Sequence, residues 1–124
     1  LQQHLGNTFW DWGIPTGASI AQLSGLELGV CATGGVSNGL MVAKAIALGA
    51  TVGGIARPFL QAHASGGIDG VRAMAERVID EIRIAALLSG CRSVGELQQA
   101  PLVVDPRLQR WIPKGSPLAE RILR

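Results

Sequence analysis

The sequence predicts an α/β fold in which parallel strands alternate with helices. Two short apolar segments, residues 26–33 and 51–56, are each followed by a stretch whose apolar residues recur at helical spacing. The apolar residues of these segments run almost without a break, which is typical of strands covered on both faces, as in parallel sheets. The order of strand, helix, strand and helix therefore indicates a parallel pairing.

The segment before the first predicted strand contains an aromatic cluster and one short helix. The first fifteen residues hold Phe9, Trp10 and Trp12, and we expect them to form an irregular loop. Thr16 is a typical capping residue, which predicts a short helix from Thr16 to about Leu23. The Trp side chains could pack over the mouth of a binding site or cover a contact between subunits, and the sequence favours neither role.

Two further helices follow the predicted strands. Ser37 or Asn38 is expected to cap a helix that Gly49 ends, because Ser and Asn cap helix starts and glycine ends helices. The longest helix is predicted from about Ile68 to Ser89, because Ala and branched aliphatic residues recur there at helical spacing.

The last part of the chain holds weaker local signals. Arg77 and Glu81 lie four residues apart on the polar side of the long helix and are expected to pair weakly. Ser93 and Glu96 have the spacing of a capping box, which predicts one more brief helix. A basic, proline-containing tail over residues 105–124 follows, and we expect it to be solvated or to contact another subunit.

Composition excludes several classes of function. Hydrophobic residues make up 48% of the chain and charged residues 16%, so the chain is not a disordered segment. No apolar run reaches the length of a membrane span, and the basic residues of the tail are too loosely spaced to favour nucleic acid. Cys31 and Cys91 lack metal-ligand spacing, so we predict no metal site and expect reduced, partly buried thiols in a cytoplasmic protein.

A two-stranded parallel sheet leaves both edges exposed and is not a stable domain by itself. We therefore expect these strands to belong to a larger sheet or barrel. The chain begins with Leu1 rather than Met, so we expect that an upstream portion is absent. Alternatively, chains associate to cover the exposed edges, and a homo-oligomer is expected.

A glycine pair, Gly34 and Gly35, stands between the first strand and its helix. Glycines there let backbone N–H groups approach a phosphate, and the helix behind them adds its positive dipole end. The second strand ends in Ala56 and Arg57, and a guanidinium can form charge-assisted hydrogen bonds with phosphate. The alternative is that the glycines only make a tight turn.

This arrangement matches the phosphate site of a (β/α)₈ barrel. In such barrels phosphate binds at the loops after the last two strands, beside a short extra helix. Residues 57–60 could form that extra helix before the long closing helix. The sequence therefore predicts the C-terminal part of a (β/α)₈ TIM barrel, namely its last two strands and their helices.

Several motifs resemble a known group of enzymes. Residues 32–40 (ATGGVSNGL) and 43–50 (AKAIALGA) resemble the closing part of FMN-dependent (β/α)₈ enzymes. Residues 12–16 (WGIPT) and 53–60 (GGIARPFL) are similar to type 2 isopentenyl diphosphate isomerases. The corresponding predicted domain spans residues 1–104.

The resemblance implies an isomerase of isoprenoid biosynthesis that interconverts isopentenyl and dimethylallyl diphosphate. It implies reduced FMN, Mg²⁺ and NADPH as cofactors and a small diphosphate as substrate. The implied FMN phosphate-binding residues are Gly34, Gly35, Val36, Ser37, Ala56 and Arg57. The family's catalytic and magnesium-binding residues belong to earlier strands, so none is assigned here and we expect the chain to be inactive alone.

Two other interpretations stay open. Residues 89–93 (SGCRS) also resemble the 2-hydroxyacid oxidases of the same superfamily, although Thr33 stands where those enzymes usually carry Asp. The chain would then be a portion of such an oxidase or dehydrogenase. The other alternative is a non-catalytic assembly module in which the glycines serve only as turns.

Overall fold

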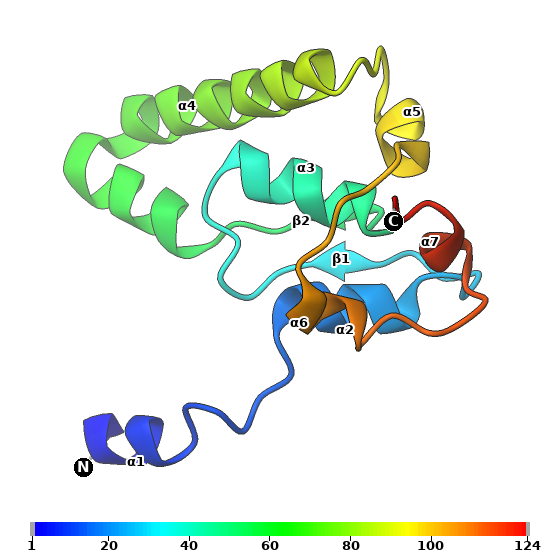
Figure 1. Ribbon diagram of the computed structural model, residues 1–124. Helices are drawn as coiled ribbons and strands as arrows, with labels where there is room; N and C mark the ends of the chain where they lie inside the picture. Colours follow the sequence, from blue (N-terminus) through cyan, green and yellow to red (C-terminus); the bar gives the residue numbers. More distant parts are fainter. Residues whose placement is uncertain (1, 124) are drawn as a thin grey trace.

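The computed structural model describes residues 2–123 and contains two parallel strands. β1 (Cys31–Ala32) pairs with β2 (Val52–Gly53) so that Cys31 lies opposite Val52 and Ala32 opposite Gly53. The α/β class and the parallel pairing are confirmed. The helices are α1 (Gln2–Thr8), α2 (Thr16–Leu23), α3 (Gly39–Ala47), α4 (Arg57–Leu88), α5 (Val94–Gln99), α6 (Pro106–Gln109) and α7 (Pro117–Glu120). Figure 1 shows α2 and α3 beside this short sheet.

Both strands are shorter than the apolar segments that predicted them. Leu26 and Leu28 belong to the first segment, yet they are 53% and 68% exposed and lie outside β1. Hydrogen bonds extend the pairing slightly, because the Gly54 N–H donates to the Ala32 carbonyl at 2.8 Å. Among the described residues each strand has a single neighbour, so the rest of each apolar segment has no ladder to join.

α3 connects the strands and lies at the centre of the core. Its residues Val42, Ala43 and Ile46 cluster with Leu97 of α5, while Ala45 packs in a second cluster with α2 and β1. Both ends of α3 match the prediction. The Asn38 side chain caps the start by accepting a hydrogen bond from the backbone N–H of Met41 at 2.9 Å. Past the other end, Gly49 adopts a φ of 116°, which glycine tolerates and other residues rarely adopt.

α4 consists of two helical limbs joined at Gly67, whose φ of 58° and ψ of −143° are not helical. Figure 1 shows the two limbs as a bent hairpin beside α3. The limbs pack closely, because a Cβ added at Gly70 would lie 2.3 Å from the Ala62 carbonyl oxygen. The first limb begins at Arg57 as predicted but continues past residue 60 to the kink at Gly67, and the long helix predicted from residue 68 is present.

The N-terminal segment differs from the prediction of an irregular loop. Residues Gln2–Thr8 form α1, which extends away from the rest of the chain in Figure 1. This helix has no apolar stripe and rests on local hydrogen bonds, so hydrophobic periodicity could not reveal it. Trp10 and Trp12 are 81% and 83% exposed, so neither covers a binding site within residues 2–123. Thr16 is the first residue of α2 and not its cap, since Pro15 occupies the capping position without a side-chain hydrogen bond.

The C-terminal tail folds back onto the core. Ile112 and Leu118 are buried in a cluster with Ala21 of α2, which corrects the expectation of a solvated tail. Residues Leu102 and Ile122 form a parallel bridge that ties the two ends of this segment together. Within the part that the structure describes, no helix combines the length and the apolar character that a membrane crossing requires.

Candidate phosphate-binding site

The Gly34–Gly35 loop lies between β1 and the start of α3. The two glycines have φ values of 85° and 79°, a conformation that residues with a Cβ adopt only with strain. The hydroxyl of Thr16, in the first turn of α2, donates a hydrogen bond to the Gly34 carbonyl at 2.7 Å. The loop is therefore held from α2 as well as by its own chain.

The backbone N–H groups of residues 34–37 form no hydrogen bond with any residue from 2 to 123. Four successive free donors on a glycine-containing loop suit an anion, because each N–H carries a partial positive charge. A Cβ added at Gly35 would meet no atom within 4 Å, so the space beside the loop is open. The loop therefore has both the donors and the room that a phosphate requires.

The first turn of α3 contributes less than the sequence suggested. Its Gly39 N–H donates to the Glu81 carboxylate at 2.6 Å, and its Met41 N–H donates to the Asn38 side chain. These two donors are occupied within the chain, so an anion at this site would depend on the loop N–H groups. The predicted Arg77–Glu81 pair is absent among the described contacts, because Glu81 faces α3 instead.

The second predicted loop, Ala56 and Arg57, lies at the end of β2. Both residues are exposed, and Arg57 begins α4 with no side-chain hydrogen bond to any residue in the described range. The ends of the two strands are close, because a Cβ added at Gly54 would lie 3.2 Å from the Thr33 Cβ. The two loops therefore leave the sheet from neighbouring strand ends.

Val36 and Ser37 complete the predicted set of site residues. Val36 is half-buried and packs against the core, so its side chain anchors the loop and leaves the backbone N–H for a ligand. Ser37 is exposed, and its hydroxyl lies 3.3 Å from the Met41 sulfur, a weak acceptor. A phosphate oxygen would be a better partner for this hydroxyl.

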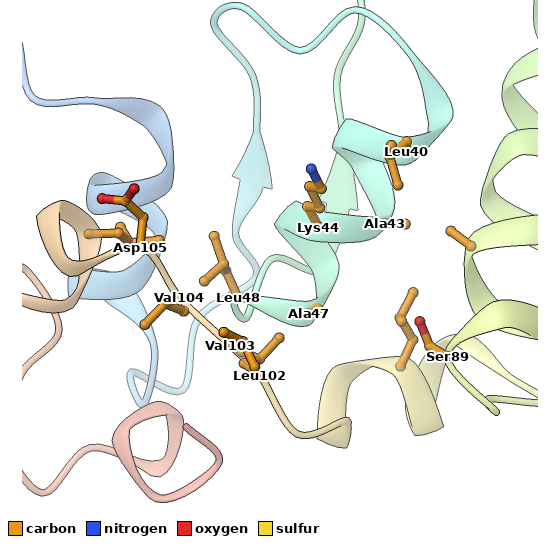
Figure 2. A pocket seen from close by; sticks show the side chains of 13 residues that line it. Leu40, Ala43, Lys44, Ala47, Leu48, Ser89, Leu102, Val103, Val104 and Asp105 are labelled. Atoms are coloured by element: carbon orange, nitrogen blue, oxygen red, sulfur yellow. The ribbon is translucent and has the colours of Figure 1, made fainter. Parts of the chain in front are cut away.

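Two cavities lie near α3. One of about 230 Å³ is bordered by Thr16, Gly34, Gly35 and the exposed Lys44, but not by Ala56 or Arg57. A larger cavity of about 450 Å³ lies between α3, the ends of α4 and α5, and the tail, as Figure 2 shows. Its lining is mainly aliphatic, with Lys44 and Asp105 as its charged members, and it contains none of the predicted site residues.

Other chemistry-bearing residues lie apart from the glycine loop. Cys31 is exposed, contrary to the expectation of a partly buried thiol, and Cys91 is half-buried. Neither forms a disulfide. Within residues 2–123 no group of three His, Cys, Asp or Glu side chains is arranged to hold a metal ion.

Comparison with known proteins assigns the chain to a family. The sequence pattern of the family described as FMN-dependent dehydrogenase matches residues 15–104. The chain belongs to the FMN-dependent dehydrogenase family. This match includes the glycine loop, both strands and the whole of α4.

Several curated relatives of this chain carry the name of one enzyme, isopentenyl-diphosphate delta-isomerase. The isopentenyl-diphosphate delta-isomerase of Thermococcus onnurineus is 42% identical over 113 residues, which cover 90% of this chain and 30% of that protein. The enzyme of the same name from Methanosarcina barkeri is 46% identical over 102 residues, covering 82% of this chain and 27% of that protein. The resemblance to the isomerases is therefore confirmed. The chain spans about 30% of the length of the Thermococcus onnurineus protein.

FMN is the cofactor that the family name implies, and the residues present fit its phosphate end. The free N–H groups of residues 34–37 and the free Arg57 guanidinium suit a phosphate dianion. Sequence reasoning missed two residues that shape this loop. Local sequence predicts a capping role for Thr16 and a pairing with Arg77 for Glu81, because the contacts that these residues make join segments far apart in the chain.

Proposed function

We propose that this chain supplies the FMN phosphate-binding part of a type 2 isopentenyl-diphosphate isomerase. The observation that carries the proposal is the identity of 42% over 90% of the chain to a protein of that name. The order of elements supports a place at the end of a (β/α)₈ barrel, with β1 and β2 as the last two strands. The domain division at residues 104 and 105 belongs to this proposal.

In the proposed site, the backbone N–H groups of Gly35, Val36 and Ser37 bind the FMN phosphate. Gly34 shapes the turn, and Thr16 holds its carbonyl. From the neighbouring strand end, Ala56 contributes backbone and Arg57 a guanidinium, which forms charge-assisted hydrogen bonds with phosphate. Bound in reduced form, FMN supplies the proton-transfer chemistry that moves the double bond. The role of this chain is to fix the phosphate and so orient the flavin.

The remaining requirements of the reaction fall outside this chain in our proposal. The diphosphate of the substrate, Mg²⁺ and NADPH would be bound by residues of the other barrel strands, and the chain alone would be inactive. Association of chains into a homo-oligomer is also proposed, since both edges of the sheet are open within the described residues.

A chimera tests the proposal. The matching 113 residues of the Thermococcus onnurineus enzyme are replaced by the corresponding residues of this chain, and isomerase activity is assayed with FMN, reductant and Mg²⁺. We expect the chimera to retain flavin and to turn over isopentenyl diphosphate, and the isolated chain to show no isomerase activity. A folded chimera that binds no FMN would contradict the proposal.

A portion of an FMN-dependent 2-hydroxyacid oxidase or dehydrogenase is the second candidate, because the chain belongs to the FMN-dependent dehydrogenase family. It predicts flavin reduction by a 2-hydroxy acid when the chain replaces the matching part of such an enzyme. The isomerase proposal predicts that only the isomerase chimera is active. Activity of the hydroxyacid chimera alone would favour this second candidate.

A further inference from the structure

Glu81 connects the closing helix to the start of α3. Its Oε2 atom accepts a hydrogen bond from the Gly39 N–H at 2.6 Å, across 42 positions of sequence. The residue is half-buried, and Gly39 is buried. A carboxylate at the first turn of a helix is favourable, because the free N–H groups there carry partial positive charge.

The contact requires the two helices to approach closely. A Cβ added at Gly39 would lie 2.2 Å from the Val78 carbonyl oxygen and 2.6 Å from the Glu81 Cβ. Only glycine therefore permits this distance between α3 and α4. The absence of a side chain at Gly39 and the carboxylate of Glu81 act together to fix the first turn of α3 against α4.

The glycine loop runs directly into this fixed point. Only Asn38, the cap of α3, separates the last of the free N–H groups, that of Ser37, from Gly39. A displacement of the first turn would therefore move the donors of Gly35 and Val36. On the other side, the loop is held by the Thr16 hydroxyl.

We propose that Glu81 is a positioning residue for the phosphate loop: it holds the first turn of α3 so that the N–H groups of residues 35–37 converge on one anion. The inference rests on the proposed phosphate site. Glu81 also satisfies the Gly39 N–H, which leaves phosphate binding to the loop.

The competing explanation is electrostatic. A carboxylate near a phosphate repels it, so Glu81 would weaken binding by its charge if it did not act through position. Two substitutions separate these effects. Glu81→Gln removes the charge and keeps an oxygen at the same reach, whereas Glu81→Asp keeps the charge and shortens the side chain by one methylene.

The test titrates inorganic phosphate into the 124-residue chain and follows the backbone amide signals of residues 34–37 by NMR. Positioning predicts phosphate affinity within about twofold of wild type for Glu81→Gln and about fivefold weaker for Glu81→Asp, the equivalent of one lost hydrogen bond. Tighter binding by Glu81→Gln with unchanged Glu81→Asp would overturn the proposal. If wild type shows no shifts at these amides on phosphate addition, the proposed site itself fails.

Two controls separate position from general stability. Asp80→Asn removes a neighbouring charge from the exposed Asp80–Arg83 pair on the same helix, and we expect unchanged phosphate affinity. Ile112→Val loosens a different core cluster, which contains no residue of the glycine loop, and serves as a destabilised reference. Equal loss of affinity in Ile112→Val and Glu81→Asp would show that Glu81 acts only through general stability.

A second measurement uses the isomerase chimera and does not depend on the isolated chain. Dissociation constants for FMN and for riboflavin, which lacks the phosphate, are compared in each variant. Positioning predicts that Glu81→Asp weakens FMN binding by about fivefold and leaves riboflavin binding unchanged. An equal loss for both flavins would contradict it.

Discussion

The Thr16 hydroxyl donates a hydrogen bond of 2.7 Å to the carbonyl oxygen of Gly34, joining α2 to the glycine loop. Gly34 has a φ of 85°, so its carbonyl is directed by a turn that only glycine makes readily. The hydrogen bond selects one orientation of this peptide group. Because the next N–H groups are the proposed phosphate donors, Thr16 contributes to the arrangement of the loop.

Replacing Thr16 by Val tests this contribution. Val keeps the shape of the side chain and removes the hydroxyl, so we expect a loss of about 1 kcal/mol in the free energy of unfolding. Phosphate affinity of the loop should fall with it. Thr16→Ser, which keeps the hydroxyl, is the matched control and should bind phosphate nearly as well as wild type. Equal affinity in Thr16→Val and wild type would contradict the prediction.

Gly35→Ala tests the need for glycine in the loop. A Cβ at Gly35 meets no atom within 4 Å, so the expected loss comes from its φ of 79° alone. We expect destabilisation of about 1–2 kcal/mol, measured by denaturant unfolding. Gly6→Ala is the matched control, because Gly6 also has free space around it and lies in helix α1. Alanine there should be neutral or stabilising, and a similar loss at both positions would show that φ is not the cause.

Local signals predicted helix ends well and strand ends poorly. The start of α3 depends on the Asn38 side chain, which accepts a hydrogen bond from an N–H three residues later, and its end depends on one glycine, so nearby residues suffice. Strand length depends on partners. An apolar run such as residues 26–33 shows which residues could be covered, but not where a neighbouring strand begins and ends, so β1 is much shorter than the run.

The sequence predicted the loops of the candidate site but not the side-chain contacts that hold the glycine loop in place. Gly34 and Gly35 carry a local signal, since a glycine pair between a strand and a helix predicts a loop with positive φ angles, and both residues have them. The contacts of Thr16 and Glu81 cross 18 and 42 positions, and no periodicity in the sequence reports them. The four-residue spacing of Arg77 and Glu81 predicts that they pair with each other. That spacing carries no information about α3, which packs against α4 and supplies the actual partner of Glu81, the Gly39 N–H.

Arg121 provides a prediction about the folded tail. Its guanidinium donates to the carbonyls of Gln98 and Ala100 near the end of α5, and to that of Ala47 at the end of α3 at 2.6 Å. Burial lowers the pKa of this guanidinium below its usual value. Arg121→Met keeps an apolar stem and leaves these acceptors without a donor, so we expect a loss of roughly 2 kcal/mol in the free energy of unfolding.

Arg110→Met is the matched control for Arg121→Met. Arg110 is exposed at the end of α6, and within residues 2–123 its side chain donates only to the carbonyl of Arg107, at 3.3 Å. We expect its replacement to change the free energy of unfolding by less than about 0.5 kcal/mol. Thermal or denaturant unfolding measures both variants, and equal effects would mean that Arg121 does not connect the tail to α3 and α5.

Glu96 gives the chain an acid-sensitive contact at the start of α5. The Arg92 backbone N–H donates to it at 2.7 Å and the Arg92 side chain at 3.2 Å, and these hydrogen bonds lower the pKa of Glu96 below its ordinary value of 4.5. Because the folded state favours the charged carboxylate, its stabilisation is present above pH 4.5 and is lost as the pH falls through the lowered pKa. Glu96→Gln should therefore destabilise the chain at neutral pH, and the difference in the free energy of unfolding between this variant and wild type should shrink on acidification.

Glu76→Gln, at an exposed carboxylate of α4, controls for removal of one negative charge. The free energy of unfolding from pH 7 to pH 3 measures the effect, and a constant difference between Glu96→Gln and wild type would contradict the assignment, because only a titrating contact loses its contribution in acid.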